Sequence, residues 1–457
     1  MEERTFRPGR LLATAVLATQ VLLAACPALA DAVTDWNTHA GAVAQAACIS
    51  PAPDPFHESR LYAMVHVAIH DTVNAIQRRS APYAYDAVAP AGTSLEAAVA
   101  TAAHAVLASE VPRLPALFAG CTSTALQVAG GLYAAALAAI PDAQAKSDGI
   151  ALGTAAAAAI IALRANDGSD APFVDFAYPQ GTRPGEWRFT GGIPFAAAPT
   201  WDRVTPFGLA RADRYMPNPP YPVQCDVHDA HAATGSCRLY ARDLEDVKNY
   251  GGAGVNLRSA DETQVAMFWV ESSPLGWNRI ARTVSPQFGF DAWQNARLFA
   301  LLNMGLADGY IASAATKYHY RYWRPETAVQ LADDDGNPYT TGQADWMPLA
   351  APTPPVPDYE SAHSVAGAVS AEVFRRVFGV DQVDFEACSV TLPNAAETCG
   401  GAQEVRRRFS SFSQAAAENG RSRVLCGYHF QNAVTKGLEH GRKIGAEIVK
   451  NHLQPAS

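Results

Sequence analysis

Apolar residues recur at spacings of three and four between Leu61 and Ile76, and this spacing marks one face of a buried amphipathic helix. Two alanine-rich runs, at 95–109 and 151–163, have high intrinsic helix propensity. No stretch of comparable length alternates apolar and polar residues at period two. The pattern therefore predicts a largely helical protein.

The same pattern of apolar residues predicts helices in the C-terminal half. We expect helices at 292–318 and 361–378, separated by a polar, proline-rich stretch at 333–357. A last long helix should run from about His429 to His452. No internal repeat is visible, which argues against a solenoid.

The segment from Asp167 to Val223 has ten prolines and many interleaved aromatic residues. Disordered linkers lack apolar surface worth burying, so this composition predicts a long ordered excursion that packs over the helices. The expected organisation is a signal peptide at 1–30, an N-terminal helical part at 31–165, a connecting segment at 166–240 and a C-terminal helical part at 241–457.

The N-terminus has the layout of a secretory signal peptide, with three arginines, an apolar run at 11–23 and an Ala-x-Ala site that ends at Ala30. We expect export to the periplasm or the medium and no transmembrane segment after signal removal, because no later stretch is apolar over about 18 residues. The alternative is a lipid anchor on Cys26, since Leu23-Ala24-Ala25-Cys26 resembles a lipoprotein processing box.

Charge and cysteine usage narrow the class of protein. A formal net charge of -9 argues against a nucleic-acid partner. An exported chain meets oxidising conditions, which favour disulfides, although the sequence leaves their connectivity open. The suggested pairs are Cys225 with Cys237, Cys388 with Cys399 and Cys48 with Cys121, which would leave Cys426 as a lone thiol.

Three short motifs carry candidate chemistry. In the first, Lys317 and Arg324 are seven residues apart, and on a continuous helix that step returns to nearly the same face. Pro325 should then end the helix and leave Arg324 near its end. The alternative is a basic, aromatic-rich helix end on the surface.

The second motif leads directly into an apolar helix. Free backbone N–H groups at a helix start favour an anion, so Ser361 with its hydroxyl and Ala362 with its backbone amide are candidate donors. His363 could transfer a proton near neutral pH. The alternative is that Ser361 is only an N-cap and His363 an ordinary helix residue.

In the third motif, Arg423 and His429 are six residues apart and could not share a face of a continuous helix. A bend at Gly427 would let them converge. A glycine-broken turn with a buried histidine is the alternative.

Taken in order, Lys-x6-Arg-Pro, Ser-x-His and Ser-Arg-x5-His at 317–433 resemble the signature of the vanadium haloperoxidase and type 2 phosphatidic acid phosphatase superfamily. Trp277-Asn278-Arg279 and His70-Asp71 look like segments of its bacterial haloperoxidase-related branch. The resemblance implies an all-α fold of two packed helix bundles, with an oxyanion site in the C-terminal bundle.

The resemblance also implies roles for these residues. Lys317, Arg324, Ser361, Ala362 and Arg423 would bind vanadate, His429 would be the axial ligand to vanadium, and His363 would be the acid–base residue. Hydrogen peroxide and a halide or small organic molecule would be the substrates; the oligomeric state stays open. One alternative is a soluble acid phosphatase that binds phosphate and uses His429 as nucleophile, and another is a non-catalytic oxyanion-binding protein.

The chain departs from the family pattern at four places. Family members commonly have Pro-Ser-Gly-His, whereas this chain has Glu360 in place of the Pro and Ala362 in place of the Gly. The Glu360 carboxylate should either weaken anion binding, unless it points away, or raise the pKa of His363. Ala433 replaces the phosphatase-type Asp, with Asn432 as a partial substitute, and this favours the haloperoxidase branch. Val356 lies five residues before the motif serine, where fungal chloroperoxidases have Phe and algal bromoperoxidases have His. It matches neither class, so the halide preference stays open.

Other candidate residues are expected to be structural. We expect His66, His70 and Asp71 to pack within their helix, because no third metal ligand is evident nearby. His319 should pack among tyrosines, Cys426 should be buried and unreactive, and His440 should be a surface residue of the last helix.

Overall fold

The computed structural model describes residues 31–225, 235–254 and 257–456. The expected signal peptide at 1–30, including Cys26, lies outside the described residues. α-Helices dominate the described chain, with two short antiparallel strand pairs, and the predicted all-α class is confirmed.

The helices of the N-terminal part follow the predicted apolar pattern. They are α1 (Ala32–Ala46), α2 (Pro55–Gln77), α3 (Leu95–Glu110), α4 (Thr122–Ala138) and α5 (Gln144–Leu163). α3 and α5 approach closely, because a Cβ at Gly149 would lie 2.6 Å from the Ser94 carbonyl oxygen and one at Gly153 would lie 2.3 Å from that of Ala98. Small residues thus let these backbones pack together.

The proline-rich segment packs over the helices, as predicted. Trp187 and Trp201 are buried, and two short strands pair antiparallel, β1 (Val174–Asp175) with β2 (Ala196–Ala197). The carboxylate of Asp308 accepts hydrogen bonds from the three consecutive backbone N–H groups of 207–209, at 2.5 to 2.8 Å. This contact ties the segment to the helix α9 (Ala292–Tyr320).

The C-terminal part contains most of the remaining elements. They are α6 (Ser236–Gly251), α7 (Ala260–Phe268), α8 (Ser273–Val284), α10 (Pro325–Gln330), α11 (Ala362–Phe378), β3 (Gln382–Ala387), β4 (Arg407–Ser411), α12 (Phe412–Leu425) and α13 (Gln431–Asn451). The last helix therefore begins two residues after His429 rather than at it.

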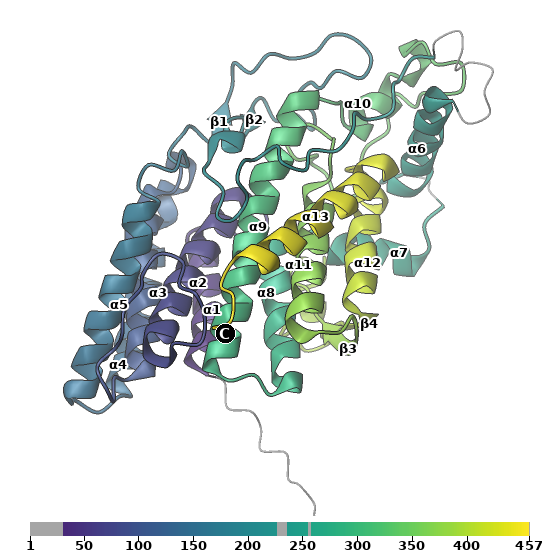
Figure 1. Cartoon of the computed structure of the whole chain (residues 1–457). Coiled ribbons are helices and arrows are strands. Elements are labelled where there is room, and N and C mark those ends of the chain that lie inside the picture. Colours follow the sequence, from purple (N-terminus) through teal and green to yellow (C-terminus); the bar gives the residue numbers. More distant parts are fainter. Residues whose placement is uncertain (1–30, 226–234, 255–256, 457) are drawn as a thin grey trace, which may run out of the picture. The chain divides into compact units, whose positions relative to one another are not determined.

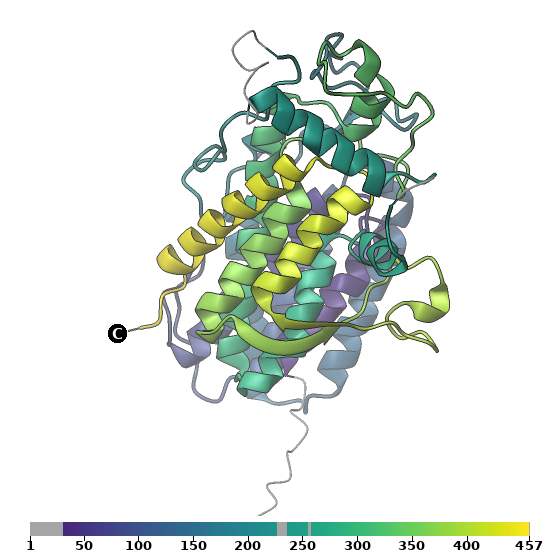
Figure 2. The same ribbon diagram turned by 90° about the vertical axis from the view of Figure 1, so that its right-hand side faces the viewer.

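Helix α9 lies between the two groups of helices and packs against α2 on one side and α11 on the other (Figure 1). A capping box of Asp291 and Gln294 sets its start. α11, α12 and α13 run side by side, with the β3–β4 hairpin across one end (Figure 2). The C-terminal bundle thus forms around one face of α9.

Two described helices are long and apolar enough to cross a membrane by length and composition. They are α9, whose apolar window is wholly buried inside the protein, and α5, whose window is 33% buried. Full burial of α9 is the behaviour of a core helix.

The cysteines pair as suggested. Disulfides join Cys48 to Cys121, Cys225 to Cys237 and Cys388 to Cys399, and Cys426 is a buried free thiol. Disulfides of this kind are typical of extracellular and periplasmic proteins.

Candidate active site

The first motif reaches the site by a chain reversal and not along one helix face. α9 ends at Tyr320, and Arg321 has a left-handed backbone with φ of 48°. Arg324 is then the N-cap of α10, with Pro325 as its first residue. The prediction that helix periodicity aligns Lys317 with Arg324 was wrong, because the helix breaks between them. Both side chains are nevertheless fully buried, and both contact the loop before Ser361.

Both cations hold the loop that precedes Ser361. Lys317 Nζ donates to the carbonyl oxygens of Pro357 and Asp358, at 2.7 and 3.0 Å. Arg324 Nε donates to the Val356 carbonyl oxygen at 2.7 Å. The positive charges are thereby fixed beside the start of α11.

The second motif forms the start of α11. Ser361 is its N-cap, and the Ser361 oxygen accepts hydrogen bonds from the Ser364 backbone N–H and from the Ser364 hydroxyl. Ala362 is the first helical residue, so its N–H is one of the free groups at the helix start. The ring Nε2 of His363 lies 3.1 Å from the Glu271 carbonyl oxygen, and His363 is half-buried while Ser361 is fully buried.

The third motif bends as predicted. Arg423 lies in the last turn of α12, and Gly427 has a positive φ of 85°. Because of this turn, the backbone N–H groups of Tyr428 and His429 both donate to the Arg423 carbonyl oxygen, at 3.0 and 3.1 Å. Arg423 NH1 donates to the Trp269 carbonyl oxygen at 2.8 Å, and its Nε has no hydrogen-bond partner within the described ranges.

His429 lies between an arginine and a carboxylate. Its Nε2 is 3.0 Å from Arg324 NH1, and its Nδ1 is 2.8 Å from Asp358 Oδ1. Asn432 does not take the place of the missing phosphatase-type Asp, because Nδ1 of His429 contacts Asp358 instead. The carboxylate beside His429 therefore comes from the loop before Ser361.

The charged residues of the three motifs act on one another electrostatically. Burial, followed by the charge of Arg324, lowers the pKa of Lys317 well below its usual value. Burial, then Arg324 and Lys317, lowers the pKa of His429. Burial raises the pKa of Asp358 to about 7, against the opposing effect of Arg324 and Lys317. The site therefore carries an excess of buried positive charge.

The effect expected of Glu360 is not found. Glu360 Oε1 lies 2.5 Å from Nδ1 of His440, and both side chains are fully buried, so the carboxylate is paired on α13. The prediction that His440 is a surface residue was wrong for the same reason. The pKa of His363 is lowered and not raised, chiefly by burial and then by Arg423.

The residues present fit an oxyanion. Among the described residues, none of Lys317, Arg324 and Arg423 forms a salt bridge with a carboxylate, although all three are buried. A buried charge without a counter-charge is costly, and the free Arg423 Nε is a donor available to a ligand. A compact anion with several oxygens would satisfy these donors together.

The remaining candidates have structural roles. His66 hydrogen-bonds to Asn37, and Asp71 accepts from the backbone N–H groups of 83–85 and pairs with His70. Among the described residues, no group of three or more His, Cys, Asp or Glu side chains is placed to hold a metal ion. His319 is exposed at the end of α9 and contacts the Tyr320 ring.

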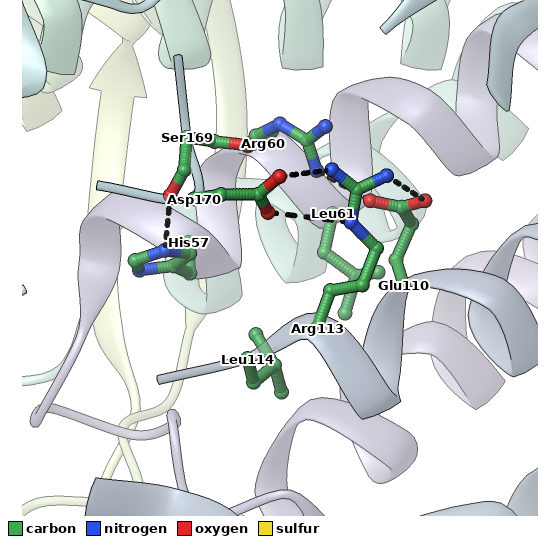
Figure 3. Close-up of a pocket in the computed structure, with 8 residues that line it drawn as sticks. All are labelled: His57, Arg60, Leu61, Glu110, Arg113, Leu114, Ser169 and Asp170. Carbon is green, nitrogen blue, oxygen red and sulfur yellow. Dashed lines mark hydrogen bonds and ion pairs between the residues drawn. The ribbon is translucent and has the colours of Figure 1, made fainter. Parts of the chain in front are cut away.

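A small cavity away from this site lies between N-terminal helices and the start of the proline-rich segment and is shown in Figure 3. Its charged residues satisfy one another: Arg60 pairs with Glu110, and Arg113 pairs with Asp170. His57 Nε2 is 3.3 Å from the Ser169 carbonyl oxygen. This balance of charges contrasts with the unpaired cations around His429.

Sequence reasoning missed Asp358 and the backbone acceptors. The signal that could have revealed Asp358 is an acidic residue three positions before the motif serine. The carbonyl oxygens of Trp269 and Glu271, which fix Arg423 and His363, belong to the turn before α8 and carry no signal of their own in the sequence.

Part of the chain matches known proteins in sequence. Residues 297–456 match the family described as the VCPO second helical-bundle domain. A stretch of 92 residues is 35% identical to the vanadium chloroperoxidase of Curvularia inaequalis; it covers 18% of this chain and only 14% of that protein.

Solved structures extend the similarity to nearly the whole chain. A bacterial vanadium-dependent iodoperoxidase superposes with a TM-score of 0.71 at 22% identity, over 93% of this chain and 97% of that one. A holo-type bacterial vanadium-dependent chloroperoxidase gives 0.64 at 16% identity, over 87% and 91%. The chain thus shares the all-helical fold of these bacterial vanadium haloperoxidases.

Proposed function

We propose that this protein is a vanadium-dependent haloperoxidase, which oxidises a halide with hydrogen peroxide at a bound vanadate. The observation that carries the proposal is a group of three buried cations without salt bridges to carboxylates, all of which act electrostatically on His429 and one of which, Arg324, contacts its Nε2. Relatives and structural neighbours named as vanadium chloro- and iodoperoxidases support it.

Each residue of the site would have its own role in binding vanadate. Lys317, Arg324 and Arg423 neutralise the oxyanion, with about 1.5 to 3 kcal/mol for each charge-assisted contact. The Ser361 hydroxyl and the Ala362 amide add neutral donors, and His429 supplies a ring nitrogen as the ligand to vanadium. When bound, vanadate would be a Lewis acid that activates the peroxide.

His363 is suited to proton transfer because it is the half-buried histidine of the site. Oxidation of a halide by hydrogen peroxide to a hypohalous acid and water consumes one proton. His363 holds one ring nitrogen against the Glu271 carbonyl oxygen, which leaves the other for the bound anion or peroxide.

The acid phosphatase alternative retains one supporting observation. The His429–Asp358 contact supplies the carboxylate whose absence at Ala433 had disfavoured this branch. Hydrolysis of phosphate monoesters with trapping of phosphate on His429 would support it. The non-catalytic alternative would need Glu360 to weaken anion binding, and the pairing of its carboxylate with His440 argues against this.

The direct test is bromination of a cyclic diketone by the purified protein with vanadate and hydrogen peroxide, repeated with iodide and chloride. We expect turnover that requires vanadate and is lost in His429→Ala. His319→Ala is the matched control, because His319 is exposed and only two residues from Lys317. Absence of turnover with every halide, in protein shown to bind vanadate, would reject the proposal.

We also propose that the chain is exported after cleavage at Ala30, which suits its three disulfides. The N-terminal sequence and mass of the secreted protein test this. A mature chain that starts at Asp31 is expected, whereas a lipid-modified Cys26 at the N-terminus would support the membrane-anchored alternative.

A further inference from the structure

The contact between His429 and Asp358 deepens the proposed function and rests on it only for the identity of the bound anion. Asp358 is fully buried and lies three residues before Ser361. Its own backbone is held on both sides: its N–H donates to the Tyr322 carbonyl oxygen at 2.9 Å, and its carbonyl oxygen accepts from Lys317. The carboxylate is therefore presented to His429 from a fixed segment.

The two neighbours of the His429 ring agree on one tautomer. Arg324 can only donate, and its Nη1 lies 3.0 Å from Nε2 and 3.4 Å from Nδ1, so Nε2 is the nearer acceptor. An ionised Asp358 can only accept, so its Oδ1 at 2.8 Å places the proton of a neutral ring on Nδ1. The lone pair of Nε2 then faces Arg324, one of the cations that an oxyanion would bind.

This tautomer decides whether the ring can bind the central atom of an oxyanion. A proton on Nε2 would block that approach, whereas a proton on Nδ1 leaves Nε2 available and fixes the ring plane. Partners of this kind around metal-ligating histidines typically change metal affinity by about 10- to 100-fold.

We propose that Asp358 is the positioning residue of His429: it holds the Nδ1–H tautomer and the ring orientation, and so replaces the carboxylate that relatives of the phosphatase type carry on the last helix. One loop, 357–361, would then both orient the histidine and supply the Ser361 donor. The assignment concerns orientation and does not require Asp358 to transfer a proton.

The test begins with the wild-type protein. In protein with ¹⁵N-labelled histidine, the His429 signals are assigned by their loss in His429→Gln, and they are expected to show a protonated Nδ1 and an unprotonated Nε2. A wild-type His429 that is protonated on Nε2 would overturn the proposal, whatever the fate of the variants and of the halogenation assay.

The variant Asp358→Leu removes the acceptor at similar volume. We expect the Nδ1–H form to lose its predominance and the affinity for orthovanadate and inorganic phosphate to fall about 10- to 100-fold. Asp243→Asn is the matched control, since Asp243 and Asp358 line one small cavity but Asp243 accepts from the Asn432 backbone N–H. If Asp358→Leu keeps both the tautomer and the affinity of the control, the proposal fails.

Discussion

At the scale of single residues, the site is defined by charges that the fold buries without neutralising them. Carbonyl oxygens, and not carboxylates, accept the hydrogen bonds of Lys317, Arg324 and Arg423. The free-energy cost of burying these charges is therefore only partly compensated until an anion binds. Burial first, and then the neighbouring positive charges, lower the pKa values of Lys317 and both histidines.

Glu58 gives a prediction about stability and pH. It is fully buried in α2, and burial raises its pKa from 4.5 to about 8. The folded state therefore keeps a proton that the unfolded chain releases, so this contribution is full below about pH 4.5 and is lost as the pH rises through about 8, by about 1.4 kcal/mol per unit. Urea unfolding of wild type and Glu58→Gln across this range measures the difference. Equal slopes would contradict the prediction.

At the scale of elements, turns and not helix faces bring the motifs together. The left-handed Arg321 reverses the chain after α9, and Gly427 reverses it between α12 and α13. At Gly427 a Cβ would also lie 2.5 Å from the Gly251 carbonyl oxygen. The position of His429 thus depends on a backbone that only glycine adopts without strain.

Gly427→Ala should therefore damage both folding and anion binding. The left-handed backbone costs about 1 kcal/mol for alanine, and the contact with Gly251 adds to it. Gly92→Ala is the matched control, because Gly92 has a similar φ of 83° with nothing within 4 Å of the added Cβ. We expect a larger loss of unfolding free energy, and weaker vanadate binding, only at Gly427. Equal effects of the two variants would contradict this account.

The buried pair of Glu360 and His440 fixes the loop before Ser361 to α13. Removal of one partner leaves a buried polar group unpaired, so Glu360→Leu or His440→Leu alone should lower the free energy of unfolding by about 3 kcal/mol or more. The double variant should lose much less than the sum of the two. A double-mutant cycle by chemical denaturation tests this. If the losses of unfolding free energy in the single variants simply add in the double variant, the two side chains do not stabilise each other.

The sequence predicted elements better than the contacts between them. The helices predicted around 61–76, 292–318 and 361–378 are found at 55–77, 292–320 and 362–378, because long apolar periodicity is a strong signal. The bend at Gly427 was predicted because no helix face could unite Arg423 with His429. Asp358 and the Glu360–His440 pair were missed, since they join side chains about 70 to 80 positions apart. Such contacts arise from tertiary packing and leave no local pattern.

At the scale of the whole molecule, α9 belongs to both groups of helices and ends where the site begins. The same fold is found in bacterial vanadium-dependent iodo- and chloroperoxidases over most of the chain. The proline-rich segment is fixed to α9 through Asp308, so it is part of the scaffold that holds Lys317 in place.

The central claim is that one buried site around His429 binds vanadate, and equilibrium dialysis of the purified protein against orthovanadate tests it most directly. We expect one vanadate per chain, competition by inorganic phosphate, and an affinity at least about tenfold lower in Lys317→Met, which loses one charge-assisted contact. Absence of saturable binding, or unchanged affinity in Lys317→Met, would contradict the account.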